Sequence, residues 1–133
     1  MFLSVKDDEM DEKYHILAVD DETQVTLVIK RVLEQEGYTV TTTNDGYAAL
    51  DIVVNSQPDL VILDINMPGI NGYQVLEKIR EQHDIPVIML SADQDVSSVG
   101  NSIGLGADDY IRKPFHLREL SARVKAKLRR LKK

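Results

Sequence analysis

Two short aliphatic runs end abruptly at aspartate residues, and this pattern constrains the fold more than any other feature. Residues 15–19 (His-Ile-Leu-Ala-Val) stop at Asp20 and Asp21, and residues 60–63 (Leu-Val-Ile-Leu) stop at Asp64. Neither run alternates between polar and apolar positions, which is typical of parallel strands buried on both faces of a sheet. Ligands of such sheets bind beyond the carboxyl ends of the strands, so the three aspartates stand where a binding site is expected.

Strand and helix patterns alternate along the rest of the chain. β-Branched and aliphatic runs predict further strands at residues 38–42, 86–90 and 108–111, the first of them an exposed edge. Apolar residues at helical spacing predict helices over residues 25–33, 48–54, 72–82, 96–105 and 117–131. Helices between successive strands imply a parallel sheet covered on both faces. The expected fold class is therefore α/β with a doubly wound sheet.

The three aspartates suggest a divalent metal site. Carboxylates that lie close together repel one another unless a cation sits between them. For Asp20 or Asp21 alone, capping of the following helix is an equally good interpretation. It explains Asp64 less well, because a loop (Ile65-Asn66-Met67-Pro68-Gly69) and not a helix start follows that residue. Oxygen ligands of this kind suit Mg²⁺.

Other polar residues follow the later strands. Ser91 and Ala92 come directly after the fourth strand, and Lys113 stands just beyond the fifth. A metal-bound Asp64 is a plausible nucleophile towards phosphorus. Lys113, the Ser91 hydroxyl and the Ala92 amide could then hold phosphoryl oxygens. Taken singly, a lysine before proline is more often a solvated surface residue, and a serine at a strand end more often caps a helix.

The composition limits the function classes. The chain has 133 residues, a net charge of −6 and no cysteine, which excludes disulfides and thiolate metal sites. No apolar stretch approaches the roughly 20 residues of a membrane span, and we expect a cytoplasmic protein without a signal peptide. Residues 1–13 form an acidic N-terminal extension, whereas residues 117–133 carry eight Lys and Arg against one acidic residue. The acidic total argues against nucleic-acid binding by the domain body.

Together these motifs resemble the receiver domain of bacterial two-component response regulators. The matching segments are Val19-Asp20-Asp21-Glu22, Leu63-Asp64-Ile65-Asn66-Met67-Pro68-Gly69, Asn71-Gly72, Leu90-Ser91-Ala92, Gly106-Ala107-Asp108-Asp109-Tyr110 and Lys113-Pro114-Phe115. The resemblance covers residues 14–130 and leaves residues 131–133 as the start of a linker or a C-terminal tail. It implies a flavodoxin-like (βα)₅ fold with strand order 2-1-3-4-5.

The resemblance also implies a phosphorylation site. Asp64 would take a phosphoryl group from a sensor histidine kinase or a small phosphodonor. Mg²⁺ (or Mn²⁺) would be ligated by Asp21, Asp64 and the carbonyl of Asn66, with Asp20 acting through water. The domain would promote only its own phosphorylation and dephosphorylation, so it would be no enzyme in the usual sense.

Four further residues receive roles from the same resemblance. Lys113 would contact the phosphate, through a loop in which the Lys113–Pro114 peptide bond is expected to be cis. Ser91 and the Ala92 amide would bond the phosphoryl oxygens. Ser91 would move inward to do so, and Tyr110 would follow into the vacated space. The change would reach the face formed by the fourth helix, the fifth strand and the last helix.

Two positions are expected to set the lifetime of the phosphorylated state. Asn66 and Asp93 lie two residues beyond Asp64 and Ser91. In receiver domains the residues at these two positions flank the path of the hydrolytic water. Asn66 is small and Asp93 is acidic, so neither is expected to block water. We therefore predict autodephosphorylation within minutes rather than hours.

The last helix resembles that of receivers joined to winged-helix DNA-binding domains, so an output domain that binds DNA is expected to follow this chain. Such receivers dimerise through ion pairs, and Asp109 with Arg123 matches one pair. Glu119 and Lys125 match halves of two more, whose counterparts here are the uncharged Val99 and Gly104. Exposed pairs contribute about 0–1 kcal/mol each. We predict a monomer or a weak, phosphorylation-dependent homodimer.

Three alternatives stay open at this point. The first is a stand-alone receiver in a phosphorelay or a chemotaxis-like motility pathway. The second is a flavodoxin-like electron carrier, although Asp20 and Asp21 would repel a flavin phosphate. The third is a phosphatase with an aspartate nucleophile, which would usually carry a second acid where this chain has Asn66.

Overall fold

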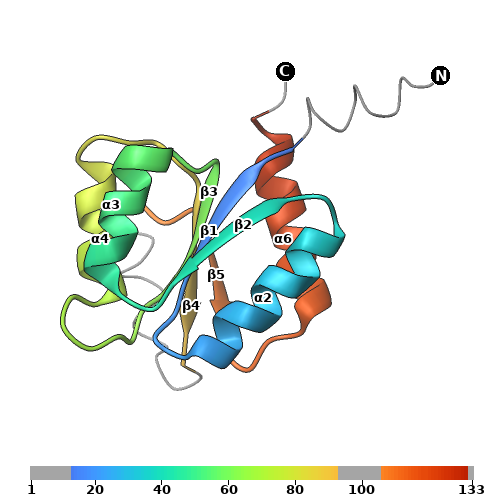
Figure 1. The fold of residues 1–133 in the computed structure, drawn as a ribbon, viewed down its shortest axis with the longest axis horizontal. Helices are drawn as coiled ribbons and strands as arrows, with labels where there is room; N and C mark the ends of the chain where they lie inside the picture. Colours follow the sequence, from blue (N-terminus) through green and yellow to red (C-terminus); the bar gives the residue numbers. More distant parts are fainter. Residues whose placement is uncertain (1–12, 93–105, 132–133) are drawn as a thin grey trace.

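The computed structural model describes residues 13–92 and 106–131. Within these residues five parallel strands form one sheet in the order β2-β1-β3-β4-β5, with helices on both of its faces (Figure 1). The predicted α/β class, the flavodoxin-like doubly wound sheet and the strand order are confirmed. The elements are β1 (His15–Val19), α2 (Thr23–Gln35), β2 (Thr39–Thr43), α3 (Gly46–Ser56), β3 (Leu60–Asp64), α4 (Gly72–Arg80), β4 (Val87–Ser91), β5 (Asp109–Arg112) and α6 (Leu117–Arg129).

The helices form two layers around the sheet. α2 and α6 cover one face, and α3 and α4 cover the other (Figure 1). Along β1, Ile16 and Ala18 join the apolar cluster that includes α2 and α6, whereas Leu17 joins the cluster that includes α3 and α4. β3 and β4 are buried at every position. Burial on both faces explains why these strands are aliphatic at successive positions.

The strand register brings the polar strand ends together. Val19, the last residue of β1, pairs with Thr43 of β2 and with Leu63 of β3. The next residues, Asp20 and Asp64, therefore leave neighbouring strands at the same edge of the sheet. β2 lies at the edge of the sheet, as its sequence predicts.

Three strands begin one residue later than the sequence predicts. Just before β2, the backbone N–H of Tyr38 donates to the carbonyl of Leu33 in the preceding helix, at 3.2 Å. Just before β4, Pro86 has no N–H to offer the sheet. α4 ends at Arg80 rather than Gln82. The predicted helix over residues 96–105 lies outside the described residues.

Two of the apolar residues whose spacing indicates helix α2 are exposed. Leu27 is 53% exposed and Val28 is 45% exposed, while Thr26, Ile29 and Leu33 are buried. A helix turns by about 100° per residue, so a continuous apolar segment must place some residues off the packed face. In the same way Val54 of α3 points to solvent, and Leu131 is exposed because α6 ends before it.

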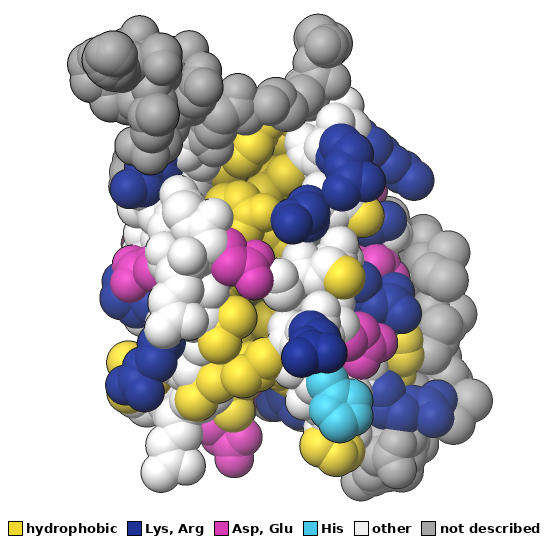
Figure 2. All heavy atoms as spheres, turned by 90° about the vertical axis from the view of Figure 1, so that its right-hand side faces the viewer, with side chains coloured by type: hydrophobic (Ala, Val, Ile, Leu, Met, Phe, Trp, Pro, Cys, Tyr) yellow, Lys and Arg dark blue, Asp and Glu magenta, His cyan; other side chains and the backbone are white. Residues whose placement is uncertain are grey.

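Val28 lines a hollow between α2 and the start of α6. Figure 2 shows a strip of hydrophobic side chains on this side of the molecule, with Lys and Arg side chains on either side of it. One hollow of about 630 Å³ opens beside the loop after β5. Its lining includes Val25, Val28, Ile29, Lys113, Phe115 and Leu117.

Candidate functional site

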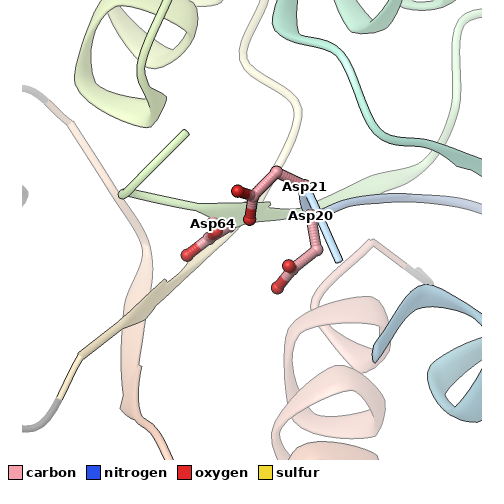
Figure 3. A group of neighbouring side chains, drawn as sticks. All are labelled: Asp20, Asp21 and Asp64. Carbon is pink, nitrogen blue, oxygen red and sulfur yellow. The ribbon is translucent and has the colours of Figure 1, made fainter. Parts of the chain in front are cut away.

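The three aspartates singled out in the sequence converge in the structure. Asp20 and Asp21 follow β1 directly, and Asp64 is the last residue of β3 (Figure 3). One carboxylate oxygen from each residue lies within 4.8 Å of those of the other two. Asp20 is 0% exposed and Asp64 is 2% exposed, whereas Asp21 is open to solvent. The cluster is thus a partly open group of oxygen ligands.

Asp20 is held at each of its hydrogen-bonding groups. Its N–H donates to the Thr43 carbonyl at 3.2 Å, and its own carbonyl accepts from the Asn44 side-chain amide at 2.7 Å. Its Oδ1 accepts from the Glu22 N–H at 2.9 Å, and its Oδ2 accepts from the Lys113 ammonium at 2.8 Å. These bonds leave the Asp20 side chain in a fixed orientation.

Capping does not account for these acids. The N-cap of α2 is Glu22, and no side-chain hydrogen bond caps that helix. After Asp64 the chain runs through a loop before α4 begins at Gly72, with Asn71 as its N-cap. The carboxylates therefore project from the strand ends without serving as helix N-caps.

Asp64 carries an unfavourable negative charge. Burial, followed by the negative charge of Asp20 and to a smaller extent that of Asp21, raises the pKa of its carboxyl, and the net value is about 7. Lys113, 3.4 Å away, and the Asn66 N–H, which donates to Oδ1 at 3.4 Å, lower the pKa again without cancelling these effects. A cation at this position would relieve the repulsion.

Lys113 supplies part of the missing positive charge. Its ammonium group lies 2.8 Å from Asp20 and 3.4 Å from Asp64. Burial by itself would lower the pKa of Lys113, but the hydrogen bond to Asp20 and the charge of Asp64 raise it. The backbone N–H of Lys113 donates to the Ser91 carbonyl at 2.6 Å, and the Lys113–Pro114 bond is cis, as the resemblance implied.

Ser91 and Tyr110 stand on neighbouring strands, β4 and β5. Asp64 pairs with Leu90, so Ser91 is the next residue along β4 from that pair. Ser91 is buried, and its hydroxyl donates to the Ala92 carbonyl at 3.2 Å. Tyr110 pairs with Met89 across β4 and β5 and packs against the core on the α3–α4 side.

The structure also places the remaining predicted residues. Asn66 is exposed in the loop after Asp64, and Asp93 lies outside the described residues. Asp109 pairs with Arg123 at 2.6 Å within the same chain, and Glu119 lies 3.3 Å from Arg123. The residues expected to pair between two chains therefore already form a network inside one chain. Lys125 is exposed on α6.

Two residues near the site were not singled out by their chemistry in the sequence. Gly72 approaches the backbone of Asp64 so closely that a Cβ would overlap the Asp64 carbonyl. Asn44 belongs to a turn, yet its side chain bonds the backbone of Asp20. Turn residues carry a general local signal in a sequence, whereas these two contacts depend on which strands are neighbours.

Sequence relatives point to one family. Residues 16–125 match the response regulator receiver domain. A probable transcriptional regulator ycf27 of Guillardia theta is 44% identical over 127 residues, which are 96% of this chain and 50% of that protein. Its counterpart in Cyanidium caldarium is 41% identical over 129 residues, or 97% of this chain and 52% of that protein. The chain thus spans about half the length of the curated relatives it matches.

Solved structures agree with this result. The receiver domain of the Francisella response regulator 1452 has a TM-score of 0.85 and 32% identity, over 90% of this chain and 100% of that one. A CheY-like receiver domain protein from Methanospirillum hungatei has a TM-score of 0.84 and 32% identity, over 90% and 96%. In the described part of the chain, no helix is long and apolar enough to cross a membrane. By sequence, fold and relatives, the chain belongs to the response regulator receiver domain family.

Proposed function

We propose that this receiver domain is a phosphorylation-activated switch that accepts a phosphoryl group on Asp64 in a Mg²⁺-dependent reaction. The observation that carries the proposal is the position of Asp64. It is buried, lies beside Asp20 and Asp21, and has the Lys113 ammonium 3.4 Å away. The domain acts as a signalling protein that modifies itself, and we place it in the cytoplasm.

The ligand set fits a hard divalent cation. Three carboxylates within 4.8 Å offer oxygen ligands, and the Lys113 ammonium group balances their charge only in part. Asp21 and Asp64, with the carbonyl of Asn66, would hold Mg²⁺ or Mn²⁺ directly, and waters would complete the shell. Asp20 already accepts two hydrogen bonds at its carboxylate, from Glu22 and Lys113, which suits an outer role through water.

The bound cation would screen the negative charge between Asp64 and an incoming phosphoryl group. An oxygen of the Asp64 carboxylate attacks phosphorus, the phosphorus–nitrogen bond to the donor histidine breaks, and the imidazole leaves with the bond's electron pair and takes up a proton. Lys113 would turn its ammonium group to a phosphoryl oxygen. The Ser91 hydroxyl and the Ala92 amide would bond others. Positioning and charge stabilisation provide most of the catalysis in such transfers.

The hollow between α2 and α6 gives the phosphodonor protein a place to bind. Lys113 lines this hollow and also forms an ion pair with Asp20 of the aspartate cluster. The hollow is largely apolar, and Val28 on its wall is half exposed. A sensor histidine kinase that packs an apolar surface here would present its phosphohistidine beside Asp64.

The output is proposed from the relatives. The ycf27 proteins are named transcriptional regulators and are about twice as long as this chain. We infer that residues 14–130 form the receiver, that residues 131–133 begin a linker, and that a DNA-binding domain follows. Phosphorylation would reach it through Ser91, Tyr110 and the face of β5 and α6. A stand-alone receiver in a phosphorelay or motility pathway is the second candidate.

Phosphorylation of this chain by acetyl phosphate tests the proposal. In Mg²⁺, intact-protein mass spectrometry should show one added phosphoryl group on the wild type, and none when EDTA is present. Asp64→Asn should remain unmodified. The control Asp51→Asn, which removes an exposed carboxylate from α3, should react like the wild type. Equal modification of Asp64→Asn and wild type would contradict the proposal.

A further inference from the structure

Asn44 ties two loops together at the carboxyl edge of the sheet. It stands in the turn between β2 and α3, and its side-chain NH₂ group donates to the Asp20 carbonyl at 2.7 Å. Its side-chain oxygen accepts from the Thr23 hydroxyl at 3.2 Å. Because the Asp20 carbonyl can only accept and the Thr23 hydroxyl can donate, these two partners also fix which way round the amide lies.

The neighbouring backbone strengthens this tie. Thr43, the residue before Asn44, accepts the N–H of Asp20 at 3.2 Å. The end of β2 therefore holds Asp20 on both sides, once at its amide and once at its carbonyl. The carbonyl lies before the first residue of α2, Thr23, so the helix provides no partner of its own for that group.

The bond to the carbonyl bears on Asp21 more than on Asp20. The Asp20 carboxylate has separate partners in Glu22 and Lys113. The Asp20 carbonyl, by contrast, belongs to the peptide unit that joins Asp20 to Asp21. Since a peptide unit is planar, fixing its oxygen fixes the plane from which the Asp21 backbone continues. Asn44 thereby sets the direction in which the exposed carboxylate of Asp21 leaves the strand end.

We propose that Asn44 is a positioning residue of the metal site, acting through the Asp20–Asp21 peptide without touching the cation. The inference rests on the proposed function, in which Asp21 and Asp64 hold Mg²⁺. Partners that orient metal ligands typically contribute about 10–100-fold to metal affinity. Since Asn44 acts through backbone, we expect the lower part of that range, roughly tenfold.

Mg²⁺ titration of the metal-free protein by calorimetry tests the inference, with stability measured separately by urea unfolding in EDTA. Asn44→Ala removes both hydrogen bonds. Asn71→Ala is the matched control, because it deletes the same side chain from the N-cap of α4. The control should lose stability and keep its Mg²⁺ affinity within about twofold of wild type, since Asn71 serves α4 and a lost cap acts on the helix.

Asn44→Asp sharpens the test and serves if Asn44→Ala fails to fold. This variant keeps an acceptor for Thr23 but replaces the NH₂ group by an oxygen that faces the Asp20 carbonyl. An added negative charge near the site would by itself attract Mg²⁺. The positioning role predicts the opposite sign, a roughly tenfold weaker affinity.

The outcomes separate this inference from the function on which it rests. Mg²⁺ affinity that falls in both Asn44 variants and holds in Asn71→Ala supports the positioning role. If wild type binds Mg²⁺ and the Asn44 variants bind it equally well, the inference is overturned and the proposed function stands. If wild type binds no Mg²⁺, or if Asp64→Asn binds it as tightly, the proposed function falls and this inference falls with it.

Discussion

Replacing Asp64 by Asn removes a buried carboxylate. Burial and the nearby charge of Asp20 make the ionised form of this carboxylate unfavourable. Its pKa rises from 3.8 to about 7, and each pKa unit corresponds to about 1.4 kcal/mol, so ionisation of Asp64 destabilises the folded state by up to ~4 kcal/mol. Water entry and side-chain relaxation screen such charges. We therefore expect Asp64→Asn to stabilise the metal-free domain by about 1–3 kcal/mol at pH 8.

The sign of the pH dependence follows from the direction of the shift. The folded pKa of Asp64 lies above the unfolded one, so the folded protein binds more protons between these two values and wild type loses stability as pH rises. Asn does not titrate. The difference between variant and wild type should be near zero at about pH 4, grow towards about pH 7 and then level off.

Urea unfolding in EDTA, followed by circular dichroism because the chain has no Trp, measures this difference. Asp51→Asn on the exposed face of α3 should change stability by less than about 0.5 kcal/mol. Saturating Mg²⁺ should stabilise wild type and leave Asp64→Asn unchanged, because a ligand stabilises only the folded state that binds it. Wild type that is as stable as Asp64→Asn at pH 8 without metal would refute the electrostatic argument.

Three further predictions concern the phosphorylated state and its partners. Asp93→Arg should lengthen the phosphoryl half-life from minutes, because a long basic side chain obstructs the water path; an unchanged or shorter half-life would contradict this. Val28→Glu should slow transfer from a cognate histidine kinase roughly tenfold, as expected for an interface contact worth 1–2 kcal/mol, while phosphorylation by acetyl phosphate stays unchanged. Val54→Glu, at a still more exposed valine of α3, is the control, and equal kinase rates for the two variants would exclude the α2–α6 hollow as the kinase-binding surface. Arg123→Ala should cost less than about 1 kcal/mol of stability, because its partly exposed pair with Asp109 is weak, and should weaken any phosphorylation-dependent dimer in sedimentation; a tight dimer of the unphosphorylated wild type through this pair would be inconsistent with our account.

The strands and the aspartate cluster were predictable because the signals are local. A buried parallel strand must be aliphatic on both faces, which marks residues 15–19 and 60–63 in the sequence itself. Neighbouring parallel strands end at the same edge of a sheet, so the sequence alone predicted that Asp20, Asp21 and Asp64 lie close together. Helical periodicity did not predict the exposure of Leu27 and Val28, because it does not show how much of α2 a neighbouring helix covers.

The rest of the site depends on long-range pairing. Lys113 meets Asp20 across 93 positions of sequence, and nothing local in either segment specifies that distance. Asn44 looks like an ordinary turn residue until the register of β1 and β2 places Thr43 beside Val19. Gly72 likewise acquires its meaning only from the close approach of α4 to Asp64.

Direct chemical identification of the phosphorylated residue tests the central claim. An acyl phosphate on aspartate is reduced by borohydride to homoserine, which peptide mass spectrometry can locate. After reaction with acetyl phosphate and Mg²⁺, the account predicts homoserine at position 64 and at neither position 20 nor position 21. Reduction at Asp20 or Asp21, or a stable phosphoryl group on another type of side chain, would contradict it.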